Sequence, residues 1–179
     1  MQNNTVKQMV LAGLMVTMGV VLPMAFHMVG LGSTFLPMHL PVLLAGFILD
    51  TPYALFAGAA TPLVSSLLTG MPPLFPVMPY MVFELAAYAG MASIMSSKKH
   101  NVYLSLLASM LAGRIVAGLA VWLLAGLFSA NLPSPPVFLA SAVITGLPGI
   151  VVQLVLLPPL VILLHKASLG KQGALQVEK

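Results

Sequence analysis

The chain has 179 residues, of which 60% are hydrophobic and only 6% are charged, and its net charge is +4. Soluble domains carry about 25% charged residues, so the composition excludes a water-soluble fold and predicts an integral membrane protein. The seven basic residues are too dispersed for the clustered basic face that nucleic-acid binding needs. The lack of cysteine excludes disulfides, Cys-ligated zinc and thiol catalysis. We expect one domain over residues 1–179.

Apolar runs separated by prolines and polar turns predict an all-α compact bundle of six transmembrane helices, over residues 7–26, 41–49, 52–69, 80–95, 102–128 and 137–164. The first run is longer than the apolar core of a signal peptide, so we expect it to be retained. Asp50 or Thr51 is expected to cap the third helix. The prolines of the last helix predict irregularities there. If residues 35–69 form one bent element, the count falls to five.

The basic residues predict how the bundle is oriented in the membrane. With six spans, Lys7, the Lys98-Lys99-His100 turn and the lysines of the C-terminal tail fall on one side. The opposite loops, 27–39, 70–79 and 129–136, hold no Lys or Arg. We therefore expect a multi-pass protein of the plasma membrane with both termini in the cytoplasm.

Two ionisable residues at bilayer depth are the first candidates for a solute site. Arg114 lies near the middle of the fifth predicted helix, and Glu84 lies one turn into the fourth, on the outer side. A charge in the hydrocarbon core is costly, so each must face protein, water or a counter-charge. Arg114 could bind an anionic group such as a carboxylate or pair with Glu84, and Glu84 could equally accept hydrogen bonds from a solute.

Four further polar residues are candidate solute contacts. Gln153, in the sixth predicted helix, needs hydrogen-bond partners that either a solute or a neighbouring helix could supply. His27 and His39 flank the first outer loop and Asn131 lies in the last, although histidines near the lipid headgroups are the plainer interpretation. Two histidines with few acids and no cysteine make a poor ligand set, so we predict no metal site and no cofactor. The loop 70–79, with four prolines, could be a lid or a plain connection.

Three stretches resemble a known family. KQMVLAGL from Lys7, FLPMHLPVLLAG from Phe35, and the region from Thr61-Pro62 to Pro79 with Glu84 are similar to the substrate-binding S component of an energy-coupling factor (ECF) transporter. The resemblance implies a vitamin or related micronutrient as substrate, bound near the outer face. It also implies three partners, a transmembrane coupling subunit and two cytoplasmic ATPases, whose ATP hydrolysis drives toppling of this subunit in the membrane.

The resemblance further implies a docking face on the first helix, where the family often carries Ala-x-x-x-Ala. Here Ala12 is followed four residues later by Val16, which departs from that pattern. Gly13 and Thr17 have the same spacing and would substitute for it. Small residues four apart permit close helix contact, either within the bundle or against a partner.

The absence of common enzyme and ATP-binding motifs argues against a catalytic function. The chain has no Walker A motif, no His-Glu-x-x-His and no Gly-x-Ser-x-Gly, so we expect no catalysis and no ATP hydrolysis by this chain itself. Our leading hypothesis is a binding subunit of an ATP-driven importer, with a carboxylated solute such as pantothenate favoured by Arg114. The alternative is a stand-alone secondary transporter, but coupling ions usually need more intramembrane polar groups.

Overall fold

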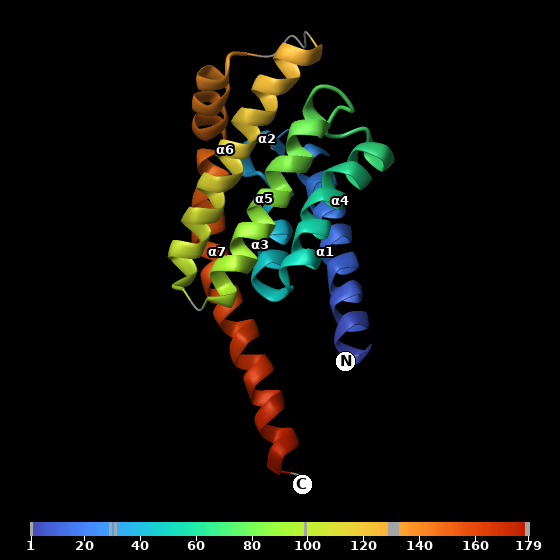
Figure 1. Cartoon of the computed structure of the whole chain (residues 1–179), viewed down its shortest axis with the longest axis vertical. Coiled ribbons are helices and arrows are strands. Elements are labelled where there is room, and N and C mark those ends of the chain that lie inside the picture. The colour runs from blue at the N-terminus through green and yellow to red at the C-terminus, as the bar shows by residue number, and fades with distance from the viewer. Residues whose placement is uncertain (1, 29, 31, 99, 129–132, 178–179) are drawn as a thin grey trace.

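The computed structural model describes residues 2–28, 30, 32–98, 100–128 and 133–177, and within them all side chains except those of residues 2, 3, 27, 28, 32, 33, 128, 165 and 167–177. The helices in these ranges are α1 (Gln2–Met28), α2 (Gly32–Phe35), α3 (His39–Ile48), α4 (Thr51–Thr69), α5 (Val77–Ser97), α6 (Val102–Phe128) and α7 (Pro135–Val177). The chain reverses direction between successive helices when α3 is counted and the single turn α2 is left out, so α1 begins and α7 ends at the same end of the bundle (Figure 1). We call this the inner end and the opposite one the outer end.

Three local features differ from the sequence-based expectations. Helix α5 begins at Val77 and includes Pro79, because a proline in the first turn lacks only an N–H that has no intrahelical partner there. Helix α7 continues through Pro148, Pro158 and Pro159 without a break. The short helix α2 was not expected from the sequence.

Asp50 takes the N-cap position of α4, as predicted, but its side chain makes no capping hydrogen bond. The backbone of Asp50 instead makes the hydrogen bonds that connect this turn to α4 and α1. The Asp50 carbonyl accepts hydrogen bonds from the backbone N–H groups of Tyr53 and Ala54, and the Asp50 N–H donates to Oε1 of Gln8 at 3.1 Å. The turn between α3 and α4 is therefore tied to the start of α1.

Four helices within the described ranges are long and apolar enough to cross a membrane: Asn4–Phe26, Val77–Ser97, Val102–Leu127 and Pro135–Leu164. Helix α4, with 19 residues, is about 28 Å long but more polar. Helix α3 has ten residues and rises about 15 Å, half the thickness of a hydrocarbon core of about 30 Å. Six full spans thus stay a prediction.

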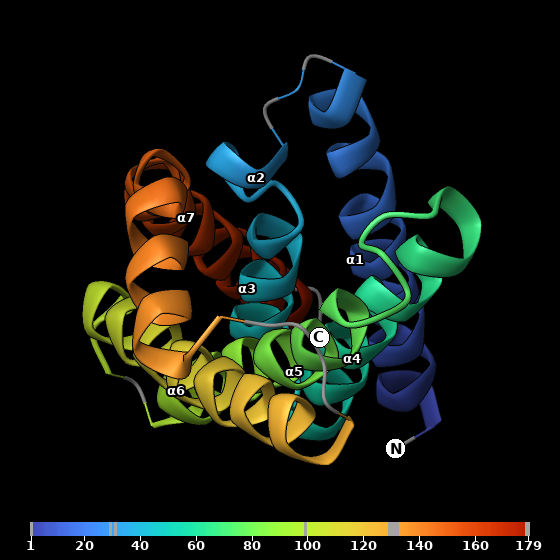
Figure 2. The same cartoon turned by 90° about the horizontal axis from the view of Figure 1, so that it is seen from above.

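Helix α3 is the centre of the bundle. Eight of its residues are buried, and it contacts α1, α4, α5 and α7, which surround it in the view from the outer end (Figure 2). Gly46 allows this packing, since a Cβ there would lie 2.5 Å from the Cβ of Ala92 on α5. By contrast, the outward faces of α1, α6 and α7 expose large apolar side chains such as Val10, Leu111 and Ile144. Apolar exposure on this scale fits lipid and not water.

Candidate functional site

A cavity of about 390 Å³ lies in the outer half of the bundle. Its walls come from the end of α1, the segment between α2 and α3, the loop after α4, and the sides of α5, α6 and α7. Most lining residues are apolar; the lining comprises Pro23, Leu36, Pro37, Met38, His39, Met71, Pro72, Pro73, Val77, Tyr80, Met81, Glu84, Arg114, Phe138, Ser141, Ala142 and Thr145. Such a volume and such walls are typical of a small-molecule site.

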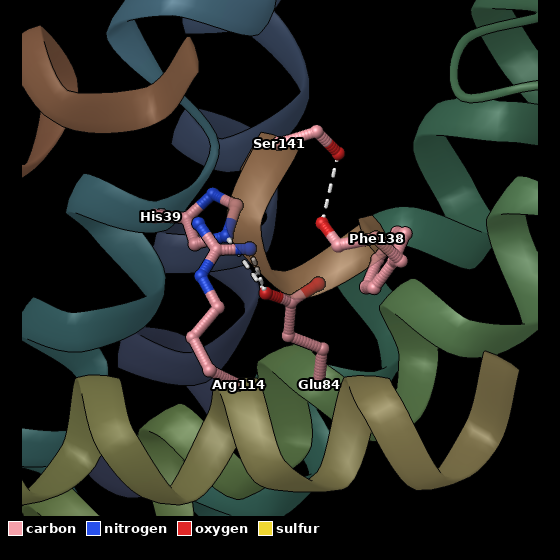
Figure 3. Close-up of polar contacts among 5 residues, drawn as sticks. All are labelled: His39, Glu84, Arg114, Phe138 and Ser141. Atoms are coloured by element: carbon pink, nitrogen blue, oxygen red, sulfur yellow. Dashed lines mark hydrogen bonds and ion pairs between the residues drawn. The ribbon is translucent and has the colours of Figure 1, made fainter. Parts of the chain in front are cut away.

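An ion pair forms the polar centre of this cavity. Nη1 of Arg114 on α6 donates a hydrogen bond to Oε1 of Glu84 on α5 at 2.7 Å, and the Glu84 side chain is 2% exposed (Figure 3). Burying either charge alone would be costly, and mutual pairing with a good hydrogen bond offsets much of that cost. The pair therefore lets two charges lie at this depth.

His39, the first residue of α3, completes the polar centre. Its Nε2 lies 3.9 Å from Oε1 of Glu84, and its ring meets the ring of Tyr88 edge-on at a centroid distance of 5.2 Å. Within the described part of the chain, neither ring nitrogen makes a hydrogen bond, and neither does Nε of Arg114. Buried polar atoms without partners are rare and often mark functional sites.

Small residues and helix spacing position this centre. Glu84 and Tyr88 are four residues apart on α5, so they lie on one face, one turn apart. Gly113, next to Arg114 on α6, faces the ring of Tyr88, and a Cβ at Gly113 would lie 2.5 Å from two of its carbons. The missing side chain at Gly113 thus brings α6, and with it Arg114, close enough to reach Glu84.

Hydroxyl groups of α4 hold the proline-rich wall in place. Ser65 and Ser66 donate hydrogen bonds from Oγ to the carbonyls of Met71 and Pro72, each at 2.6 Å. The Thr69 hydroxyl donates to the carbonyl of Ser65 at 2.7 Å, and its Oγ1 accepts a hydrogen bond from the N–H of Met71 at 3.2 Å. Prolines cannot donate backbone hydrogen bonds, so these hydroxyls supply the contacts that fix a segment with few of its own.

Two aromatic rings meet on another wall of the cavity. Tyr80 of α5 and Phe138 of α7 contact one another edge to face, with centroids 5.1 Å apart. Just beyond them, Ser141 Oγ donates a hydrogen bond to the carbonyl of Phe138 at 2.9 Å (Figure 3). Aromatic faces beside a polar centre suit a flat, partly apolar solute.

Of the candidate solute contacts predicted from the sequence, the structure brings Glu84, Arg114 and His39 together. Gln153 is buried on α7 at 1% exposure but does not line the cavity, and its Nε2 has no hydrogen-bond partner among the described residues. The side chain of His27 and the whole of Asn131 lie outside the described residues.

The proposed docking residues separate into two faces of α1. Ala12 is 2% exposed and packs in the core, and Val16 packs partly against the same core. Gly13 and Thr17 lie on the exposed face, where Thr17 Oγ1 donates to the carbonyl of Gly13 at 2.9 Å. Of these four residues, only Gly13 and Thr17 are exposed.

Sequence reasoning missed much of the lining. Tyr80, Phe138 and Thr145 were not selected as site residues, because an aromatic or hydroxyl residue on an apolar helix carries no distinctive pattern. One signal was available for Tyr80: it lies four residues before Glu84 and therefore on the same face of a helix. No comparable signal marks Phe138, since its position depends on how α7 packs.

Comparison with known proteins gives one match. The family described as ECF transporter, substrate-specific component matches residues 7–161, which include every residue that lines the cavity. No curated protein and no solved structure matches the chain.

Proposed function

Because the chain belongs to the family of ECF transporter substrate-specific components, which are multi-pass plasma-membrane proteins that bind solutes, we propose that it captures a micronutrient in the cavity around Glu84 and Arg114. The observation that carries the proposal is the cavity itself. It combines apolar walls with a buried ion pair and opens a space of about 390 Å³.

The distribution of charge supports an outward-facing cavity. Lys7 lies near the start of α1, Lys98 directly follows α5 and Lys166 lies in the last part of α7. The start of α1 and the ends of α5 and α7 lie at the inner end of the bundle, whereas the cavity lies in the outer half (Figure 1). Basic residues favour the cytoplasmic side, so we place the inner end in the cytoplasm and the cavity toward the exterior. A solute would then enter from outside the cell.

ATP-driven import would need the partners with which this family works, a membrane coupling module and ATPases. We propose that the exposed face of α1 around Gly13 and Thr17 contacts the coupling subunit, since a glycine permits close approach of a second helix. A stand-alone secondary transporter is the weaker candidate, because the described residues that line the cavity include only one acid and one base, and these already pair.

The ion pair also changes the case for a carboxylated solute such as pantothenate. That expectation was based on a free positive charge at Arg114. With Nη1 bound to Glu84, the positive charge is already neutralised, and the sequence-based argument for a carboxylate loses its main support.

The test of the function blocks the cavity without touching the ion pair. Ala142→Trp places an indole in the cavity, whereas Ile144→Trp, two residues along α7, points to lipid from a side chain that is 74% exposed. We expect the first variant to lose at least ten-fold in ligand retention and the second to match wild type. Mass spectrometry of small molecules that co-purify with each folded variant measures this. Equal retention by both variants would place the ligand elsewhere.

Uptake distinguishes the two transport mechanisms. In cells that contain the coupling subunit and ATPases, we expect import to stop when ATP hydrolysis is blocked by a Walker A substitution in the ATPases. Import by the chain alone in proteoliposomes, driven by a proton or sodium gradient, would support the secondary transporter instead.

A further inference from the structure

The charges that face the cavity sum to zero. Glu84 and Arg114 are the only acid and base among the described residues of its lining. Oε1 of Glu84 lies 2.7 Å from Nη1 of Arg114. The remaining titratable groups that face the pair are His39, Tyr80 and Tyr88.

A charged ligand would fit this balance badly. A carboxylate that bound the free N–H groups of Arg114 would place two buried negative charges, its own and that of Glu84, against one positive charge. A cation that bound Glu84 would likewise place two positive charges against one negative charge. In both cases the ligand would also lose its own hydration on entering an apolar cavity, and a site of zero net charge would not compensate for that loss.

A neutral ligand can instead use the hydrogen-bonding positions that the pair leaves open. The contact between the two side chains uses only Nη1 of Arg114 and Oε1 of Glu84. No hydrogen bond from any described residue reaches Nη2 of Arg114 or Oε2 of Glu84. Arg114 thus keeps N–H donors on Nη2 and Nε, and Glu84 keeps an acceptor at Oε2, with neither charge exposed alone.

We propose that the substrate is electrically neutral and carries an N–H donor beside a carbonyl or ring-nitrogen acceptor on one flat edge, as in a cyclic amide, a ureide or an amino-substituted nitrogen heterocycle. Its N–H donates to Oε2 of Glu84, and its acceptor receives the N–H of Nη2 of Arg114. The rest of the ring system lies between Tyr80 and Phe138 on one wall and Met81 and the prolines on the others. This inference rests on the proposed function of solute capture.

The direct test identifies what the protein retains. Detergent-purified wild type is equilibrated with the low-molecular-mass fraction of yeast extract, washed and denatured, and the released molecules are identified by mass spectrometry. We expect a molecule that is uncharged at pH 7, has a donor and acceptor on adjacent ring positions, and is absent from the Ala142→Trp variant. A retained carboxylate or cation would overturn the ligand class while leaving solute capture intact. Retention of nothing by folded wild type would overturn solute capture and the ligand class with it.

Charge-removal variants give a second readout on the same molecule. For a neutral ligand, Glu84→Gln and Arg114→Gln should each weaken retention at least ten-fold, because each disturbs one half of the donor–acceptor edge. An anionic ligand predicts the opposite for Glu84→Gln, tighter binding, because a repelling carboxylate is removed. The double variant Glu84→Gln/Arg114→Gln, which leaves no buried charge unpaired, serves as the control for folding.

Discussion

At the scale of single residues, the ion pair between Glu84 and Arg114 has to be considered as one unit. Each charge lies buried because the other is there, with side-chain exposures of 2% and 13%. Removing one partner leaves an uncompensated buried charge, which typically costs about 3–5 kcal/mol. Removing both charges together avoids that penalty. The loss of stability measured when only one of the two residues is changed is therefore larger than the contribution of the pair itself.

We therefore predict strong coupling in a double-mutant cycle. Arg114→Gln and Glu84→Gln should each lower the free energy of unfolding by about 3 kcal/mol, whereas the double variant Glu84→Gln/Arg114→Gln should lose clearly less than the sum. Denaturation in detergent, followed by circular dichroism, measures this. Additive losses would show that the two side chains do not interact in the folded protein. Solute binding by Arg114→Gln is then measured on protein that circular dichroism shows to be folded.

At the scale of elements, the contact between α5 and α6 depends on a missing side chain. Gly113 faces Tyr88, whose ring in turn packs against His39. We predict that Gly113→Ala separates the two helices near the ion pair and lowers both the midpoint of thermal unfolding and ligand retention. Gly126→Ala, on the same helix with no atom within 4 Å of the added Cβ, is the matched control. It should be neutral or stabilising by about 1 kcal/mol, because alanine favours helix over glycine. Equal effects of the two changes would contradict the packing account.

A second prediction at this scale concerns the proline-rich wall. Ser66→Ala removes the hydrogen bond to the Pro72 carbonyl, worth about 1 kcal/mol. We expect ligand dissociation to become several-fold faster, because Pro72 and its neighbours form part of the cavity wall. Ser97→Ala, which removes a similar hydrogen bond at the inner end of α5, is the control and should leave dissociation unchanged. The dissociation rates are measured after rapid dilution of the protein with its ligand bound. Identical rates for the two variants would exclude a role for the proline-rich wall in ligand retention.

How far the sequence predicted these elements depends on the kind of signal involved. Polar residues in apolar helices are conspicuous, so Glu84, Arg114 and His39 could be selected from the sequence alone. Their mutual distances could not, because they depend on how α3, α5 and α6 pack. Gln153 shows the limit of the method, since it has the same sequence signal as Arg114 yet lies away from the cavity. Asp50 shows another, because a residue at an N-cap position need not use its side chain.

At the scale of the whole molecule, the proposed orientation in the membrane is based on a few lysines and can be tested directly. The chain has no cysteine, so single cysteines introduced at the outer and inner ends of the bundle can be labelled without background. We predict that a membrane-impermeant maleimide labels Leu74→Cys on intact cells, since Leu74 is an exposed residue of the outer loop, but not Ser97→Cys. Labelling of both after permeabilisation is the control. The reverse pattern would turn the cavity toward the cytoplasm.

Helix α3 reaches only half-way through the bundle, and the cavity begins at its first residue, His39. A bound solute would occupy the volume that further turns of this helix would otherwise fill, and would brace α1 against α5 and α7. A bound solute should therefore stabilise the outer half of the bundle. At a solute concentration 100 times Kd, mass action alone adds about 2.7 kcal/mol to the free energy of unfolding. Heat resistance of the purified protein would therefore report occupancy, even while the identity of the solute is unknown.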